Sequence, residues 1–380
     1  MQIAFISPFA PLKGGIARFS GVLRDALQGR GYAVTSLAFK ALYPDFLVKG
    51  GADGVPVAET ASFCEARLVL FNPFTWFGAV RRLRSLKPEL LLVAYWSGLL
   101  APLYFVIRRL TGIKMVVLLH NLSSHEPFFF DPLTQRLLAA SADGVLTLSG
   151  AVTQEVRALM PDVPLLQLFH PLYEPDGESC SVEEARSALN LDLHSPVLLF
   201  FGYVRRYKGL DTMLRAMPAI LQREPALRLV VAGHFHESAE RYRTLLAQLG
   251  IEGSVDLYPG YVSRERTALF FAAVDAVALP YRSATQSGVV QFAYAHGLPV
   301  IVTPAGSLPE MVCHGKTGWV APDCSAAGFA EAVGEFLDCR QRRELKAIRP
   351  AIEAFNRDFS WESFTEAAGV FFESIAAKKL

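Results

Sequence analysis

The sequence lacks the cysteine spacing of a disulfide-rich or zinc-binding domain. None of its five cysteines forms a C-x-x-C pair with another. An odd count without paired spacing argues against a disulfide framework and favours a reducing compartment. We therefore expect a cytoplasmic protein, at most attached to the inner face of a membrane. The five residues are Cys64, Cys180, Cys313, Cys324 and Cys339.

An excess of charge of one sign is also missing. The chain has 37 Lys and Arg against 36 Asp and Glu, a formal net charge of +1. This balance argues against bulk binding to nucleic acid. Only 19% of the residues are charged whereas 52% are hydrophobic, so the chain can bury large cores. The first residues show no basic segment and no small-residue cleavage site, so we expect no signal peptide.

One long apolar run is present. Residues 90–107 contain no charged side chain over 18 positions, the threshold length for a membrane-spanning helix. Ser97, Gly98 and Pro102 interrupt the run, which also divides naturally into a strand, a turn and a helix. An integral membrane protein is therefore an alternative at this stage, and purification without detergent would exclude it.

Strand and helix patterns alternate along the chain. Its 380 residues suffice for two domains of about 150–200 residues each. Short, fully apolar strands separated by helices predict parallel sheets covered on both faces. A polar segment, residues 171–184, is interpreted as a linker. The expected strands are 2–6, 33–39, 67–71, 90–95, 115–119, 144–148 and 165–168 before this segment, and 197–201, 227–232, 255–257, 276–279 and 300–302 after it.

The fold class that follows is α/β, with two doubly wound, Rossmann-like domains in tandem. We expect an N-terminal domain over residues 1–172, a second domain over 185–358, and a helix in 359–380 that packs back towards the first domain. Open sheets of this class bind ligands outside the carboxyl ends of their strands. A ligand cleft is therefore expected between two facing carboxyl edges.

The tract FGYVRRYKGLD, residues 201–211, is the most informative segment. A glycine turn follows a buried strand, and Arg205, Arg206 and Lys208 precede the next helix. Three cations at the carboxyl end of a strand predict an anionic ligand, most plausibly a phosphate or diphosphate. The alternative is an ordinary basic surface loop.

The first domain offers two weaker candidates. Gly14 and Gly15 lie between the first strand and the first helix, where backbone amides suit an anion, although a simple turn explains them equally well. No G-x-G-x-x-G pattern is present, which argues against an NAD enzyme. His120 directly follows a strand and could contact a ligand hydroxyl. For His125, a ligand contact and a structural role are equal alternatives.

A second loop of the C-terminal half resembles a phosphate cradle. Gln286, Ser287 and Gly288 precede a helix, so small side chains and free amides would stand at its start. A later loop at the end of a strand carries Glu310. These loops and the cations would converge on one ligand.

Together these segments resemble the retaining glycosyltransferases of family 4, which have the GT-B fold. The resemblance covers nearly the whole chain and is most specific in FGYVRRYKGLD, SGVVQFAYAHGLPVIVT and GSLPE. It implies that Lys208 holds the diphosphate of the donor. Tyr203 occupies the place of the usual arginine, so that charge is assigned to Arg205. The resemblance implies a sugar contact for His120 and donor contacts for Gly14, Gly15, Gly202, Gln286, Ser287, Gly288, Val289 and Glu310.

One departure concerns two glutamates that the family usually carries eight positions apart. Ala284 and Phe292 stand at these positions. In the family one carboxylate contacts the transferred sugar and the other the ribose. Their absence means that the protein holds these groups differently or has lost turnover, and the intact Gln286–Gly288 segment favours the first interpretation.

The implied function is transfer of a sugar from a nucleotide-diphosphate donor to a hydroxyl of a glycan or lipid-linked acceptor, with retention of configuration. We expect no cofactor and no metal, because no His, Asp and Glu stand at helical ligand spacing near His120. A non-catalytic nucleotide-sugar-binding protein is the first alternative. A nucleotide-sugar 2-epimerase is less favoured, because that reaction needs the missing carboxylates.

Residues 72–114 suggest a possible membrane partner. This segment holds seven Lys or Arg against one acid, Glu89, and Trp76 and Phe77 precede the first basic cluster. Such a segment suits docking on anionic lipid, and an ordinary solvated helix face is an equal alternative.

Overall fold

The computed structural model describes residues 1–10, 12, 14–42, 64–122, 131–172, 180–284, 287–342 and 344–377. The predictions made for His125 and Gln286 lie outside these residues. The chain divides into two compact units. Unit 1 combines residues 1–169 with 361–380, and unit 2 is residues 170–360.

Unit 1 is built on a seven-stranded sheet in the order β3-β2-β1-β4-β5-β6-β7, and every neighbouring pair is parallel. Its strands are β1 (Gln2–Ser7), β2 (Ala33–Ala41), β3 (Cys64–Val69), β4 (Leu90–Tyr95), β5 (Met115–Leu119), β6 (Gly144–Thr147) and β7 (Leu165–Gln167). Its helices are α1 (Gly15–Gly29), α2 (Pro73–Leu86), α3 (Ala101–Thr111), α4 (Asp131–Ala139), α5 (Gly150–Leu159) and α13 (Trp361–Ala377).

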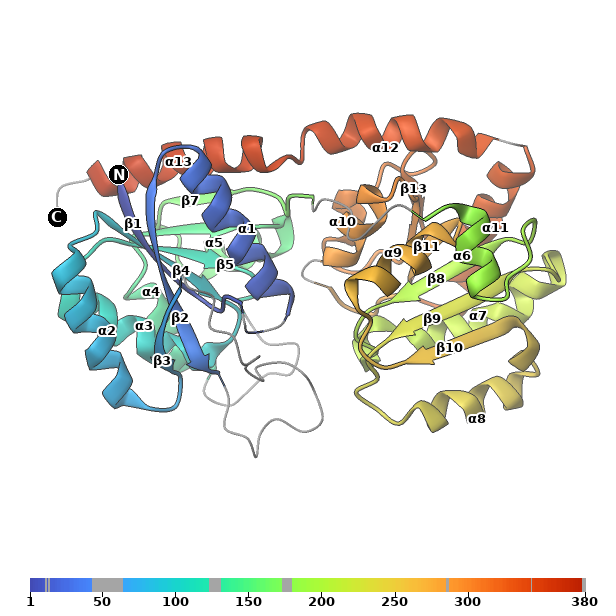
Figure 1. The fold of residues 1–380 in the computed structure, drawn as a ribbon, viewed down its shortest axis with the longest axis horizontal. Helices are drawn as coiled ribbons and strands as arrows, with labels where there is room; N and C mark the ends of the chain where they lie inside the picture. The colour runs from blue at the N-terminus through green and yellow to red at the C-terminus, as the bar shows by residue number, and fades with distance from the viewer. Residues whose placement is uncertain are drawn as a thin grey trace. The chain divides into compact units, whose positions relative to one another are not determined.

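Both faces of this sheet are covered (Figure 1). Alternate side chains of β4 enter different cores: Leu91 and Val93 pack with α2 and α3, whereas Leu92 packs with α1 and α13. A strand buried on both sides needs apolar residues at every position, which is why β4 and β5 are continuous apolar runs. Helix α13 is distant in sequence from the rest of unit 1, yet Phe364 lies edge-to-face with Phe19 of α1 at 5.9 Å.

Unit 2 has a six-stranded parallel sheet in the order β10-β9-β8-β11-β12-β13. Helix α7 packs beside α11, and α6 beside α9. The strands are β8 (Val197–Phe201), β9 (Arg228–Gly233), β10 (Val255–Pro259), β11 (Ala276–Leu279), β12 (Val300–Val302) and β13 (Gly318–Val320). The helices are α6 (Val182–Ala188), α7 (Leu210–Arg223), α8 (Ala239–Leu249), α9 (Arg264–Ala272), α10 (Gly288–Ala295), α11 (Ala326–Gln341) and α12 (Ile348–Arg357).

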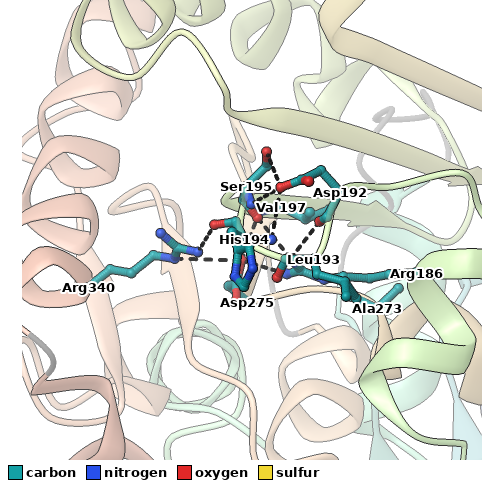
Figure 2. A network of polar contacts seen from close by, with 9 residues as sticks. All are labelled: Arg186, Asp192, Leu193, His194, Ser195, Val197, Ala273, Asp275 and Arg340. Carbon is teal, nitrogen blue, oxygen red and sulfur yellow. Dashed lines mark hydrogen bonds and ion pairs between the residues drawn. The ribbon is translucent and has the colours of Figure 1, made fainter.

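The buried Arg186 fixes the amino edge of this second sheet (Figure 2). Its guanidinium donates to the carbonyls of Ala273, Asp192, Leu193 and Ser195, and pairs with Asp275 at 3.0 Å. A buried cation with this many acceptors is a structural clamp, because its donors are already used. These contacts lie at the amino edge of the sheet, opposite the carboxyl ends of its strands. We therefore assign Arg186 a structural role.

The predicted fold class, two doubly wound parallel α/β domains, is confirmed. Three local predictions were wrong. Strand β3 starts at Cys64 rather than at residue 67, because an edge strand also accepts Glu65, which pairs with Arg82. Strand β13 was missed, since its short apolar run begins with Gly318, a weak strand former. The predicted linker extends too far, because a capping box of Ser181 and Glu184 already begins α6.

The apolar run of residues 90–107 forms β4, a short 3-10 turn (η2, Gly98–Leu100) and the first part of α3. Within the described residues, no helix is both long and apolar enough to cross a membrane.

Candidate functional site

Two glycines bring the carboxyl ends of β8 and β9 into close contact. The N–H of Gly202 donates to Ala232 O at 2.9 Å. A Cβ on Gly233 would lie 1.7 Å from Gly202 O, so a side chain cannot fit there. The next residues continue the contact, because Val204 N donates to His234 O at 2.8 Å. The turn after β8 is therefore fixed in position.

Lys208 follows this turn in the short 3-10 helix η3 (Arg206–Lys208) and is buried. Its Nζ lies 5.5 Å from the ring centre of Tyr281, and 3.5 Å from the place that a Cβ on Gly202 would take. No Asp or Glu in the described part of the chain forms an ion pair with it. Burial lowers the pKa of Lys208, and Arg205 lowers it further. Lys208 is thus a desolvated cation without a carboxylate partner among the residues that the structure describes.

The loop after β11 closes against η3 from the other side. A Cβ on Gly209, whose φ is 68°, would lie 1.9 Å from Pro280 O. Arg282 N donates to Tyr207 O at 2.7 Å, and the Arg282 guanidinium pairs with Asp211 at 2.5 Å. These contacts place Tyr281, between Pro280 and Arg282, directly beside Lys208.

Tyr281 connects Lys208 to the start of α10. Its hydroxyl is hydrogen-bonded to Ser287 Oγ at 3.2 Å, and Ser287 Oγ accepts the N–H of Val289 as the N-cap of the helix. Burial raises the pKa of Tyr281, so the phenol stays protonated and can donate. No atom lies within 4 Å of the place where a Cβ on Gly288 would stand. Gly288 is therefore the point of this first turn that a ligand can approach, since Ser287 and Val289 are buried.

Four residues predicted from sequence converge at this point: Gly202, Lys208, Ser287 and Val289. A methyl group of Val289 lies 3.9 Å from the position of a Cβ on Gly202. An ammonium group and a helix N-terminus at one place favour an anion of high charge.

Two neighbouring cations have different surroundings. Arg206 is mostly exposed and pairs with Glu237, which also pairs with Arg241. Its charge is thus directed towards a carboxylate. Arg205 is exposed at the N-cap of η3. Tyr203, at the position of the family's usual arginine, lies 6.0 Å from the ring of His234 and 5.7 Å from that of His236.

The two positions at which the resemblance implies glutamates, Ala284 and Phe292, are occupied by apolar side chains. Ala284 is buried, and its carbonyl is so close to Gly306 that a Cβ there would lie 1.5 Å from it. Phe292 is partly buried and packs against the apolar core of unit 2, with its ring centre 6.3 Å from that of Phe271. Neither position offers a polar side chain to a ligand.

Glu310 lies in the 3-10 helix η5 (Leu308–Met311) and is exposed. Tyr294 of α10 donates to Met311 O at 2.8 Å, so η5 is tied to the helix that Ser287 caps.

In unit 1 the predicted residues lie on the carboxyl side of the sheet. His120 follows β5, is buried, and donates its backbone N–H to Tyr95 O at 2.8 Å. Its ring meets Phe19 edge-to-face at 5.2 Å. Phe19 belongs to α1, whose N-cap is Gly14 with φ 129° and whose first residue is Gly15. Nothing lies within 4 Å of the place of a Cβ on Gly15, so this helix start is also open.

The sequence analysis did not assign a role to Tyr281. The sequence did offer a signal for it, because Tyr281 directly follows a buried strand and Pro280 at the carboxyl edge of the predicted sheet. Among the residues that the structure describes, no group of three or more His, Cys, Asp or Glu could hold a metal ion.

Comparison with known families follows the division into units. Residues 14–168 match the model of the glycosyl transferase 4-like domain, and residues 181–350 match that of the glycosyl transferases group 1. Each unit carries a glycosyltransferase domain. The matches begin at Gly14 and, in the second half, at the capping residue of α6, so they include the open helix starts of both units.

Solved structures extend the likeness to the whole chain and establish the GT-B fold. Sucrose-phosphate synthase from Thermosynechococcus elongatus is 21% identical and has a TM-score of 0.75, with 99% of each chain covered. Alr3699/HepE from Anabaena in complex with UDP is 16% identical and also has a TM-score of 0.75, over 98% of this chain and all of that one.

A curated relative, the D-inositol 3-phosphate glycosyltransferase of Corynebacterium aurimucosum, is 33% identical over 195 residues. The match covers 50% of this chain and 45% of the relative. The GT-B chain thus spans about half the length of the curated relatives that it matches.

Proposed function

We propose that this GT-B protein transfers a sugar from a nucleotide-diphosphate donor to a hydroxyl acceptor with retention of configuration. The observation that carries the proposal is Lys208, a buried ammonium on Tyr281 beside the N-terminus of α10, with no carboxylate partner in the described parts of the chain. Leaving a charge buried and unpaired is unfavourable, so such an arrangement favours a ligand that supplies the countercharge. The HepE structure with UDP supports a diphosphate as that ligand.

In the proposed reaction the bond between sugar C1 and the diphosphate oxygen breaks, and a bond between C1 and the acceptor oxygen forms on the same face. The acceptor proton passes to a phosphate oxygen, and a nucleoside diphosphate leaves. Negative charge grows on the phosphate oxygens during this step. Lys208 and the amides at the start of α10 are already in place to stabilise it.

The remaining residues receive supporting roles. Arg205 adds positive charge beside Lys208, and Gly202, Gln286, Gly288 and Val289 let the donor approach the backbone. We assign His120 to the transferred sugar, Gly14 and Gly15 to the donor phosphates and the acceptor, and Glu310 to the donor. The acceptor is a glycan or lipid-linked hydroxyl compound. D-inositol 3-phosphate, for which the curated relatives are named, belongs in the panel of acceptors to test.

Substitution of Lys208 by Met tests the diphosphate site. Lys208→Met retains the length of the side chain and removes its charge. We expect UDP, ADP or GDP to raise the melting temperature of the unmodified protein and to lose this effect in the variant. Turnover with the matching donor should fall at least a hundredfold.

Arg206→Gln is the matched control, because Arg206 lies in the same short helix but directs its charge towards Glu237. It should change nucleotide binding and turnover by no more than a few-fold. Unaltered nucleotide stabilisation in Lys208→Met would refute the assignment, since the fold does not depend on a buried charge without a partner.

A non-catalytic nucleotide-sugar-binding protein is the second candidate. The apolar residues Ala284 and Phe292 favour it, because they remove both carboxylates that the family usually places near the sugar and ribose. It predicts nucleotide stabilisation together with complete absence of sugar transfer and donor hydrolysis. A donor panel incubated with glycan, lipid-linked and D-inositol 3-phosphate acceptors, followed by measurement of released nucleoside diphosphate, separates the two.

A further inference from the structure

Three exposed phenylalanines lie together at the N-terminal end of α2. Phe71 precedes the helix, and Phe74 and Phe77 lie on its first two turns, one turn apart. They expose 47%, 84% and 57% of their surface, whereas Ala79 and Leu83 on the inner side of the helix are fully buried. Apolar side chains gathered at one exposed place indicate an interaction surface.

The outward side of the same helix continues with cations. Arg81 follows Phe77 by four residues, and Arg84 and Lys87 follow at intervals of three. All three are exposed. The helix contains no Asp or Glu, and Arg82, which pairs with Glu65 of β3, is directed elsewhere. We call the six residues the α2 face: Phe71, Phe74, Phe77, Arg81, Arg84 and Lys87.

A neighbouring helix extends this surface. The Arg84 guanidinium donates to Leu110 O at 2.5 Å, which joins the end of α2 to the end of α3. Arg109 and Leu110 are themselves exposed there. The end of α3 therefore adds one cation and one apolar side chain beside the cationic end of the α2 face.

We propose that the α2 face docks on a bilayer that contains anionic lipid. Aromatic side chains on one helix enter the boundary between headgroups and acyl chains, and neighbouring cations bind lipid phosphates. Both features occur on one outward side, so a flat anionic surface satisfies them together. The charge pattern complements such a membrane, because the helix presents three cations and no acid.

The location fits the use of a lipid-linked acceptor. Strand β3 ends at Val69, so Phe71 stands at the carboxyl edge of the unit 1 sheet, the edge that also carries His120. Docking through the phenylalanine end of the α2 face would hold this edge near the bilayer. The docking does not need the proposed transfer reaction; only the choice of a lipid-linked acceptor rests on that function.

Flotation of the full chain with lipid vesicles tests the proposal. We expect binding to phosphatidylcholine vesicles that contain phosphatidylglycerol, weaker binding at high salt, and little binding to phosphatidylcholine alone. Each cation near an anionic surface is worth roughly a fivefold change in binding, so the triple variant Arg81→Gln, Arg84→Gln, Lys87→Gln should lose on the order of a hundredfold. The double variant Phe74→Ser, Phe77→Ser should lose at least tenfold.

Matched controls use exposed residues elsewhere in the chain. Arg136→Gln, Arg157→Gln and Lys316→Gln remove three exposed cations, and Leu133→Ser removes an apolar side chain that is 61% exposed. These variants should bind vesicles like the unmodified chain. Equal losses in the controls and the α2 variants would overturn the proposal, as would equal binding to neutral and anionic vesicles or no binding at all.

Nucleotide-induced thermal stabilisation, measured on the same variants, separates this proposal from the proposed function. Substitutions in the α2 face should leave it unchanged. Vesicle binding that depends on the α2 face without any effect of nucleotides would reject the proposed function and retain the docking surface. Nucleotide stabilisation, together with vesicle binding that does not depend on the α2 face, would retain the proposed function and reject the docking surface.

Discussion

Lys208 shows how a side chain proposed to bind a ligand opposes stability. Burial lowers its pKa, so the folded state disfavours the charged form that a diphosphate requires. A bound diphosphate supplies negative charge and raises the pKa again, which couples donor binding to protonation. Replacement by Met removes the buried charge and should stabilise the empty protein by about 1–4 kcal/mol. The residue is retained at the expense of stability.

His170 gives a pH-dependent prediction. Burial lowers its pKa to about 4, against an opposing hydrogen bond to Pro171 O. Between pH 6.5 and 4 the unfolded chain binds a proton that the folded chain excludes, so stability falls as the pH decreases through this window. The loss should reach at most about 3 kcal/mol. Urea titrations of unmodified protein and His170→Gln at several pH values measure it.

His194→Gln serves as the control, because His194 is exposed. It should retain the acid-dependent loss, whereas His170→Gln should reduce it. Identical pH profiles for the unmodified chain and His170→Gln would contradict the assignment.

At the scale of elements, the candidate site consists of loops that glycines allow to touch. Gly209 against Pro280 and Gly306 against Ala284 are contacts between backbones that are far apart in sequence. Sequence patterns predicted Lys208 and Ser287, since each stands at the junction of a strand and a helix. They could not predict that Tyr281 joins them, because that contact depends on how closely β8 and β11 bring their loops together.

Gly209→Ala tests this loop contact. The substitution places a methyl group 1.9 Å from Pro280 O at a residue with φ 68°. We expect a loss of about 3 kcal/mol or more, since both strain and collision act, together with loss of nucleotide stabilisation. Thermal unfolding with and without UDP, ADP and GDP measures both effects.

Gly250→Ala isolates the strain, because its φ is 66° but no atom lies within 4 Å of the added methyl group. It should cost about 1–2 kcal/mol and leave nucleotide binding intact. Similar behaviour of the two variants would show that the contact with Pro280 does not shape the site.

At the scale of the whole molecule, the alternation of apolar strands and helices was sufficient to predict two doubly wound sheets. Strand β4 could be predicted because it is buried on both faces, so its sequence is a continuous apolar run. Two edge strands were harder to predict, because β3 contains Glu65 and β13 begins with Gly318. The start of α6 was missed because the capping box of Ser181 and Glu184 looked like a polar linker.

Helix α13 makes unit 1 depend on a segment distant in sequence. Phe372 is fully buried against the first sheet, whereas Val370 on the same helix is 67% exposed. Phe372→Ala should destabilise the protein by about 3–5 kcal/mol, because it leaves a cavity. Val370→Ala should change stability by less than about 0.5 kcal/mol. Chemical denaturation of both variants measures the difference, and equal stabilities would show that α13 does not complete this core.

The path of the chain also sets an order of events during synthesis. All of unit 2 leaves the ribosome before the helix that fills the last part of the unit 1 core. Until α13 is present, the Phe19 side of the unit 1 sheet has α1 but lacks the phenylalanines that complete its core. A released chain that ends at Ser360 should accordingly protect unit 2 from protease and leave unit 1 open to cleavage.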